Sequence, residues 1–304
     1  MVSSDNNNIV NSNKTDIGNF TSPPSEGLGE ASWGGILPYH RSSLLFILLF
    51  FWLGGKSFLP LLIIAFPLFL FASVLTALTT TIGCQIGNGH FWGYYPGKWW
   101  SWFTIRILFL PVKIEGRENL DPKQSYVFVS NHQGAFDIFL IYGFLGRNFK
   151  WMMKKAIRKI PLVGLACEKA HHIYVDKSGA SKIKKTYDTA RKTLHEGMSV
   201  VVFPEGARSF TGHMGKFRRG AFMLADELQL PVCPLTINGS FDVMPRTKDW
   251  HFPVWHRLSL TIHKPIFPKG KGTEFEKETL NEAYDSVMAG LSPEYQGFVE
   301  NPDQ

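Results

Sequence analysis

The chain has 304 residues, of which 44% are hydrophobic, 14% aromatic and 19% charged, and its formal net charge is +7. This length is sufficient for one large domain or two small ones, and the positive charge favours an anionic partner. The three cysteines, Cys84, Cys167 and Cys233, are far apart in the sequence and lack metal-ligand spacing. We therefore expect neither a disulfide-rich scaffold nor a zinc-binding module. The cysteine content favours a protein of a reducing compartment.

The N-terminal region divides into a polar part and an apolar part. Residues 1–40 contain many Asn and Ser, one lysine and four acidic residues, so we expect a disordered tail. Residues 31–114 contain no Asp or Glu and include two apolar segments, 44–53 and 58–78. The second has 21 uncharged residues, about 31 Å as a helix, which is enough to cross a bilayer core.

We therefore predict a membrane-associated helical segment over residues 41–111, with a buried core helix as the alternative. Pro60 and Pro67 favour a helix that is kinked or lies partly in the membrane. Eight of the thirteen residues in 91–103 are aromatic, a composition typical of the membrane–water interface.

Residues 112–304 alternate between short apolar runs and helical patterns. The predicted strands cover residues 126–130, 149–153, 173–175, 199–203, 232–237 and 258–262. The predicted helices cover residues 137–145, 180–196, 220–228 and 274–291. This order predicts an α/β domain with a largely parallel sheet flanked by helices, in which functional groups gather where strands end.

Positive charge is concentrated in residues 147–192, where thirteen basic side chains against three acidic ones give a net charge of +10. On a membrane-attached protein this segment would be attracted to an anionic lipid surface, and a simply solvated helix face is the alternative for many of its members. A nucleic-acid binder is disfavoured, because the aromatic residues cluster in 91–103 rather than among these lysines.

Two pairs combine a histidine with an aspartate five residues later. His171 and Asp176 bracket a predicted strand, where positions five apart point to opposite faces. His132 follows a strand, and Gly134 lets the chain turn into a helix that carries Asp137. This second pair suits general-base catalysis on a substrate hydroxyl, because Ser and Cys nucleophiles are absent from the motif. A structural histidine bonded to a helix carboxylate is the alternative.

A second polar turn, residues 203–209, follows the predicted strand 199–203. It reads Phe-Pro-Glu-Gly-Ala-Arg-Ser, and Arg208 could hold a phosphate with two parallel hydrogen bonds. If residues 203–209 are considered alone, an ordinary surface turn without a binding role is the alternative.

Together the two motifs resemble the glycerolipid acyltransferases, of which the 1-acyl-sn-glycerol-3-phosphate acyltransferases are the best-known members. Two further blocks resemble the family in the same order, Ile-Tyr-Val-Asp-Lys at 173–177 and Pro-Val-Cys-Pro-Leu at 231–235. The segment Lys155-x5-Pro161-x2-Gly164 also resembles the one that leads into the second block. The resemblance covers roughly residues 105–245.

The resemblance implies a transfer of an acyl group from acyl-CoA or acyl carrier protein to the free hydroxyl of lysophosphatidate, giving phosphatidic acid. His132 would be the catalytic base and Asp137 would orient it. The implied substrate-binding residues are Glu205, Gly206, Arg208, Lys177 and Lys155. No metal or resident cofactor is implied, since the thioester is a co-substrate. Membrane phospholipids are the expected surroundings, with the catalytic domain on the cytoplasmic side.

Three positions depart from the family pattern and leave the acceptor open. Lys177 replaces the usual Arg, His171 stands where Gly is common, and Ala207 replaces the commoner Thr. The alternative acceptors are another lysophospholipid, glycerol 3-phosphate or a lyso-aminolipid. From a different class, the chain could be a non-catalytic protein that binds membrane surfaces.

Overall fold

The computed structural model describes residues 59–175, 180–194, 198–247 and 251–299. The tail predicted for residues 1–40 and the apolar segment 44–53 lie outside these described residues. The expectations for both segments, and for the division of the chain after residues 40 and 111, stay predictions.

Within the described residues, seven strands form one sheet in the order β1-β7-β6-β2-β5-β3-β4. They are β1 (Val112–Glu115), β2 (Val127–Ser130), β3 (Phe149–Lys154), β4 (Ile173–Val175), β5 (Ser199–Val202), β6 (Val232–Asn238) and β7 (Leu258–Ile262). Every neighbouring pair is parallel except β6 and β7, so β1 and β7 run opposite to the other five. The prediction of a largely parallel sheet is confirmed.

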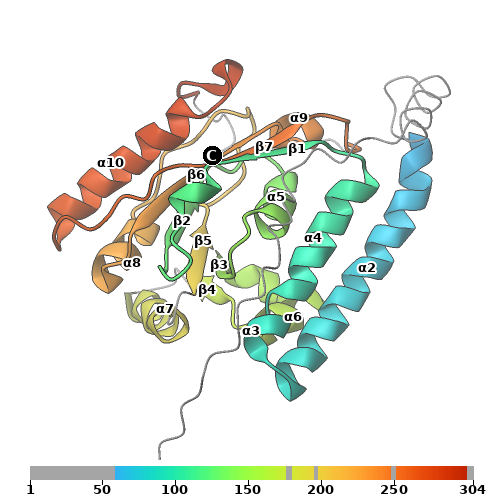
Figure 1. Cartoon of the computed structure of the whole chain (residues 1–304), viewed down its shortest axis with the longest axis horizontal. Coiled ribbons are helices and arrows are strands. Elements are labelled where there is room, and N and C mark those ends of the chain that lie inside the picture. The colour runs from blue at the N-terminus through green and yellow to red at the C-terminus, as the bar shows by residue number, and fades with distance from the viewer. Residues whose placement is uncertain (1–58, 176–179, 195–197, 248–250, 300–304) are drawn as a thin grey trace, which may run out of the picture. The chain divides into compact units, whose positions relative to one another are not determined.

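Helices precede and connect these strands (Figure 1). The α-helices of the described part are α2 (Leu59–Ile86), α3 (Gly89–Trp92), α4 (Tyr95–Ile107), α5 (Phe136–Phe144), α6 (Val163–Lys169), α7 (Ala180–Thr193), α8 (Gly220–Leu228), α9 (Ser240–Val243) and α10 (Thr273–Ala289). Short 3-10 helices are η1 (Arg117–Asn119), η2 (Lys155–Lys159) and η3 (Pro293–Tyr295). Two acidic residues, Glu274 and Glu276, lie in the first turn of α10, where the helix dipole favours negative charge.

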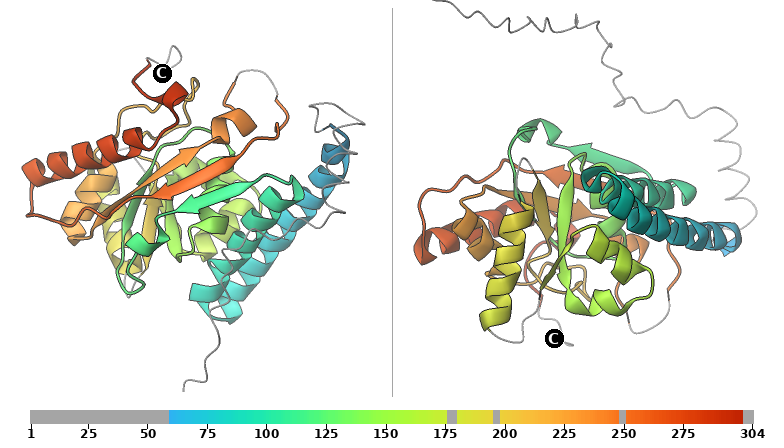
Figure 2. Two further views of the ribbon diagram at one scale, coloured as in Figure 1. Left: turned by 45° about the horizontal axis from the view of Figure 1, so that its top comes forward. Right: turned by 90° about the horizontal axis from the view of Figure 1, so that it is seen from below.

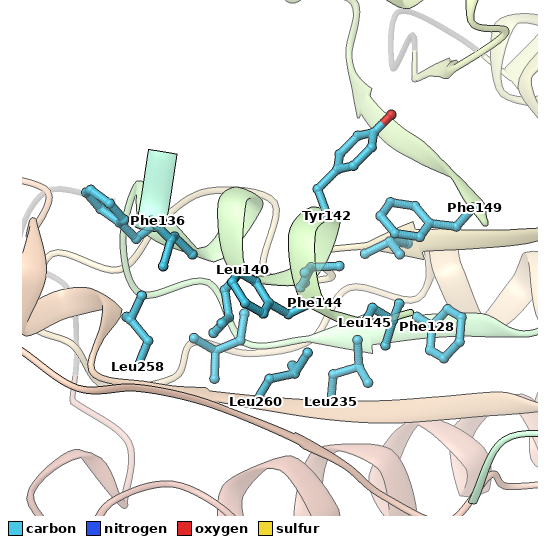
Figure 3. Close-up of a cluster of buried hydrophobic side chains, with 14 of the residues drawn as sticks. Phe128, Phe136, Leu140, Tyr142, Phe144, Leu145, Phe149, Leu235, Leu258 and Leu260 are labelled. Atoms are coloured by element: carbon cyan, nitrogen blue, oxygen red, sulfur yellow. The ribbon is translucent and has the colours of Figure 1, made fainter. Parts of the chain in front are cut away.

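Both faces of the sheet are covered, as expected for strands that are apolar on both sides. Side chains alternate along β2: Phe128 joins a buried cluster with α4 and α5, whereas Val127 and Val129 join a cluster with α7, α8 and α10. Figure 2 shows the same division, with α2 and α4 on one side of the sheet and α10 on the other. The close-up of the first cluster shows Leu140 of α5 pointing towards Leu258 and Leu260 of β7 (Figure 3).

Helix α2 exposes most of its apolar surface. Its stretch Ile63–Ile86 has a mean hydropathy of 2.1 and is long and apolar enough to cross a membrane. Ile64 and Phe71 are 64% and 68% exposed, and only 17% of the most apolar part of this stretch is buried. The alternative of a buried core helix is therefore disfavoured, because a soluble domain seldom exposes so much contiguous apolar surface.

Helix α2 is joined to the α/β part through aromatic contacts. The indole Nε1 of Trp100 in α4 donates to Ser73 Oγ in α2 at 2.9 Å. The Trp100 ring lies 5.8 Å from the ring of Phe69 in α2 and 4.9 Å from that of Phe139 in α5. Phe139 lies in the first turn of α5, only two residues beyond Asp137. Helices α2 and α4 are therefore packed close to the start of α5.

The carboxyl ends of the five parallel strands β2 to β6 meet at one edge of the sheet. Gly134, in the turn between β2 and α5, shows how closely the loops pack there. A Cβ atom at this position would lie 2.3 Å from the carbonyl oxygen of Ser240, so only glycine fits. The chain segments that follow β2, β5 and β6 are thus packed against each other at this edge.

Replacing Leu140 by alanine is expected to lower the free energy of unfolding by about 2–5 kcal/mol, because this fully buried side chain fills the space between α5 and the sheet. The measurement is the thermal unfolding temperature of the detergent-solubilised protein. Ile138→Ala, on the same helix but 40% exposed, is the matched control and should cost much less. Equal losses in the two variants would contradict the packing described here.

Candidate active site

The register between strands β2 and β5 places His132 next to Glu205. Val129 of β2 is paired with Val202 of β5, and each chain continues for three residues to His132 and Glu205. The backbone N–H of His132 donates to Glu205 Oε1 at 2.6 Å. Two residues that are 73 positions apart in the sequence are thereby brought together at the carboxyl edge of the sheet.

The turn after β2 folds Asp137 back onto His132. Nδ1 of His132 donates to Asp137 Oδ2 at 2.6 Å, and the backbone N–H of Gly134 donates to the same oxygen at 3.0 Å. The Asp137 side chain is fully buried, and that of His132 is 14% exposed. Since a carboxylate only accepts, the proton of the neutral imidazole is held on Nδ1, and Nε2 keeps a free lone pair for a substrate proton.

The other His–Asp pair offers no such geometry. His171 is exposed and has a positive φ of 56°, and Asp176 lies outside the described residues. Of the two pairs, the structure therefore brings together His132 and Asp137.

An aromatic stack supports the imidazole ring of His132. Its centroid lies 3.9 Å from that of Phe203, with the planes 10° apart, and Phe203 in turn stacks on Trp151 of β3 at 5.7 Å. The sequence pattern assigns no role to either aromatic residue. For Phe203 the available signal is its place between a buried strand and the Pro-Glu turn.

Glu205 holds two loops together. Its Oε1 accepts from the His132 N–H and its Oε2 accepts from the Gly215 N–H at 2.8 Å, while the side chain is buried. Burial raises the pKa of Glu205 to about 8, against the opposing effect of the two backbone hydrogen bonds. This geometry favours a positioning role, and the expectation that Glu205 touches substrate stays a prediction.

Asn131 fixes the backbone just before His132. Its amide Nδ2 donates to the carbonyl of Ile237 at 2.9 Å, and its Oδ1 accepts from the Ile237 N–H at 2.8 Å. The Ser209 N–H donates to the His132 carbonyl at 2.8 Å. Asn131 is therefore tied to β6, and the backbone of His132 is tied to the polar turn. In the sequence, the signal for this role is an Asn directly after a predicted strand. The structure buries its side chain fully.

The remaining predicted residues lie around the same edge at different depths. Gly206 has a φ of +80°, which glycine adopts readily, and Arg208 is half-buried on the same turn. Lys155 is exposed and follows β3 directly, at the level of Glu205 when the register of β3 and β5 is continued. Lys177 lies outside the described residues. Among the described residues, no group of three His, Cys, Asp or Glu side chains is placed to hold a metal ion.

The chain resembles known acyltransferases in sequence and in structure. Residues 111–238 match a family model described as Acyltransferase. A 1-acyl-sn-glycerol-3-phosphate acyltransferase of Chlamydomonas reinhardtii is 32% identical over 64% of this chain, and a chloroplastic one of Arabidopsis thaliana is 34% identical over 54%. The crystal structure of the 1-acyl-sn-glycerophosphate acyltransferase PlsC from Thermotoga maritima superposes with a TM-score of 0.52 at 26% identity, covering 64% of this chain and 79% of that one.

The aligned region spans about half the length of these curated relatives, namely 58% of the Chlamydomonas protein and 46% of the Arabidopsis protein. The resemblance first suggested by four short blocks is thus confirmed for the central part of the chain.

The raised pKa of Glu205 predicts a pH-dependent difference in stability between the protein and its Glu205→Gln variant. Between pH 4.5 and 8 the folded protein holds a proton on Glu205 that the unfolded chain releases, so this group's contribution to stability is lost as the pH rises through about 8. The slope is at most about 1.4 kcal/mol per pH unit. The variant cannot titrate, so its stability relative to the native protein should improve from pH 5 to pH 8.

Thermal unfolding temperatures across this pH range measure that difference. Glu118→Gln removes an exposed carboxylate and serves as the control. A pH-independent offset for Glu205→Gln would contradict a buried, protonated Glu205.

Proposed function

We propose that this chain transfers a fatty acyl group from a thioester to the sn-2 hydroxyl of 1-acyl-sn-glycerol 3-phosphate, giving phosphatidic acid, because residues 111–238 match the acyltransferase family model. The observation that carries the proposal is the 2.6 Å contact between His132 Nδ1 and Asp137 Oδ2 beside an arginine-bearing turn. The buried His–Asp pair favours catalysis over simple binding to a membrane surface.

The geometry supports a direct transfer with His132 as the general base. Nε2 takes the proton of the acceptor hydroxyl as the hydroxyl oxygen attacks the thioester carbonyl carbon. Asp137 holds the ring in the required tautomer and stabilises the imidazolium that forms. When the tetrahedral intermediate collapses, the C–S bond breaks and the leaving thiolate recovers the proton from Nε2. The thioester supplies the activated acyl group, so the proposal includes no resident cofactor.

Arg208 is proposed to bind the acceptor phosphate. It lies on the turn whose Ser209 N–H is bonded to the His132 carbonyl, so a guanidinium and the base are held on adjoining backbone. The phosphate and the sn-2 hydroxyl of the acceptor are on neighbouring carbons, which suits this short separation. The exposed Lys155 at the same edge is proposed to attract the anionic substrates as they approach.

The proposed acceptor and product are lipids, which agrees with the exposed apolar surface of α2. We place α2 in the membrane and the α/β part at the cytoplasmic surface, because the basic segment 147–192 favours that side. Acyl-CoA or acyl carrier protein would deliver the thioester from the cytosol.

The reaction is tested by mixing acyl-CoA and lysophosphatidate with the purified protein and recording thiol release. His132→Asn keeps a polar side chain that cannot take the proton, so the rate should fall about 10²–10⁴-fold. His171→Asn removes the histidine of the other pair, and asparagine tolerates its positive φ, so this variant should retain the native rate. No thiol release by the native protein with any lysolipid would refute the proposed function.

Phe203 is expected to assist the base through its stacking on the imidazole. An imidazolium is attracted to an aromatic face, so Phe203→Leu should lower kcat about 3- to 30-fold while the KM of the acceptor stays nearly constant. Phe203→Tyr should restore most of the rate. Phe128→Leu, which removes the same volume from the buried core away from His132, is the control. A rise in KM without a loss of kcat would contradict this role.

A further inference from the structure

Two further arginines, Arg218 and Arg246, lie against the polar turn that carries Arg208. The backbone N–H of Arg218 donates to the carbonyl of Pro204, and its guanidinium packs against Gly206, 3.2–3.3 Å from where a Cβ atom would stand. Arg246 approaches from the segment after α9, 38 residues further along the chain. This cluster extends beyond the resemblance noted in the sequence, which ends near residue 245.

Arg246 is held in a defined position beside Arg208. Its Nη1 donates to the carbonyl oxygen of Arg208 at 2.9 Å, and its Cζ lies 3.9 Å from the centroid of the Phe210 ring. A guanidinium stacked on an aromatic ring loses little further freedom when it binds an anion, because its plane is already fixed.

The two positive charges are close enough to oppose each other. Burial lowers the pKa of Arg208, the charge of Arg246 lowers it further, and Asp137 acts in the opposite direction. Asp137 is already bonded to His132 and Gly134. Within the described ranges, neither Arg208 nor Arg246 forms an ion pair with a carboxylate. Two half-buried guanidinium groups without a counterion are best compensated by a ligand with two negative charges.

We propose that Arg246 acts with Arg208 as a specificity-determining pair that selects acceptors whose phosphate is a monoester. A phosphate monoester carries nearly two negative charges at neutral pH and presents three oxygens, enough for both guanidinium groups. A phosphodiester headgroup carries one charge and has one oxygen blocked by its alcohol. The identity of the ligand rests on the proposed function, and the pair would discriminate lysophosphatidate from lysophospholipids with a diester headgroup.

The test measures binding without an acyl donor, so it does not depend on turnover. Lysophosphatidate and lysophosphatidylglycerol of the same acyl chain are titrated, in detergent micelles, into the full-length protein and its Arg246→Met and Arg246→Lys variants. In the native protein the monoester should bind at least tenfold more tightly than the diester. Arg246→Met should weaken monoester binding about 10- to 100-fold and leave diester binding within about threefold. Arg246→Lys should recover part of the loss.

Arg147→Met is the matched control for a structural effect. Arg147 also lies over an aromatic ring, that of Tyr126, and donates to a backbone carbonyl, that of Gln124, but it precedes β3 at the opposite edge of the sheet. This variant should bind both lipids as the native protein does. Equal weakening of the two lipids by Arg246→Met, or unchanged monoester binding, would overturn the proposal.

Thiol release measured in parallel separates this proposal from the proposed function. Selective monoester binding that depends on Arg246, without transfer from acyl-CoA, would support the site and refute the activity. Transfer to lysophosphatidate with equal affinity for both lipids would support the activity and refute the role of Arg246.

Discussion

The parallel pairing of β2 with β5 and β6 is the constraint on which the site depends. The loops after β2 and β5 leave the carboxyl ends of their strands at the same level, and three anchors tie them to each other and to β6. Glu205 binds the His132 N–H, Asn131 binds the backbone of Ile237, and the Ser209 N–H binds the His132 carbonyl. A shift of one residue in the register of β2 would place His132 on the opposite face of the sheet and remove all three anchors. The imidazole is thus oriented by backbone hydrogen bonds before Asp137 and Phe203 act on its ring.

The two buried carboxyl side chains of this edge have different hydrogen-bond partners. Asp137 lies in the first turn of α5, where a helix favours negative charge, and it accepts from His132 and Gly134 on one oxygen. Glu205 is bonded through both oxygens to backbone N–H groups, yet its burial raises its pKa to about 8. In the proposed reaction, the first would stabilise the charge that appears on His132. The second is suited to hold two loops at a fixed distance, because each of its oxygens is already occupied.

The features that the sequence predicted well are those set by neighbouring residues. Six strands were expected at or close to their observed bounds, because β7 shows strict apolar alternation and the others are short segments rich in apolar residues. His132 with Asp137 needed only a five-residue turn. Strand β1 was missed because it has only four residues, too few for its alternation of apolar and charged side chains to stand out. The antiparallel pairing of β6 and β7 could not be inferred from their apolar patterns, which do not encode strand direction. The same holds for Arg246, because only the fold of the segment after β6 brings it to Arg208.

The proximity of α2 to the start of α5 links the apolar surface to the chemistry. Phe69 of α2 lies 6.1 Å from Phe139 of α5, and Asp137 is half a helical turn before Phe139. A lysophospholipid has an acyl chain that prefers hydrocarbon and a phosphate that prefers cations, with the reactive hydroxyl between them. In the proposed function, the exposed side chains of α2 would meet the first need, and Arg208 with its neighbours Arg218 and Arg246 would meet the second. In the proposed reaction, an acceptor would present its hydroxyl to His132 while its acyl chain remains in the membrane, so the cost of transferring that chain into water is avoided.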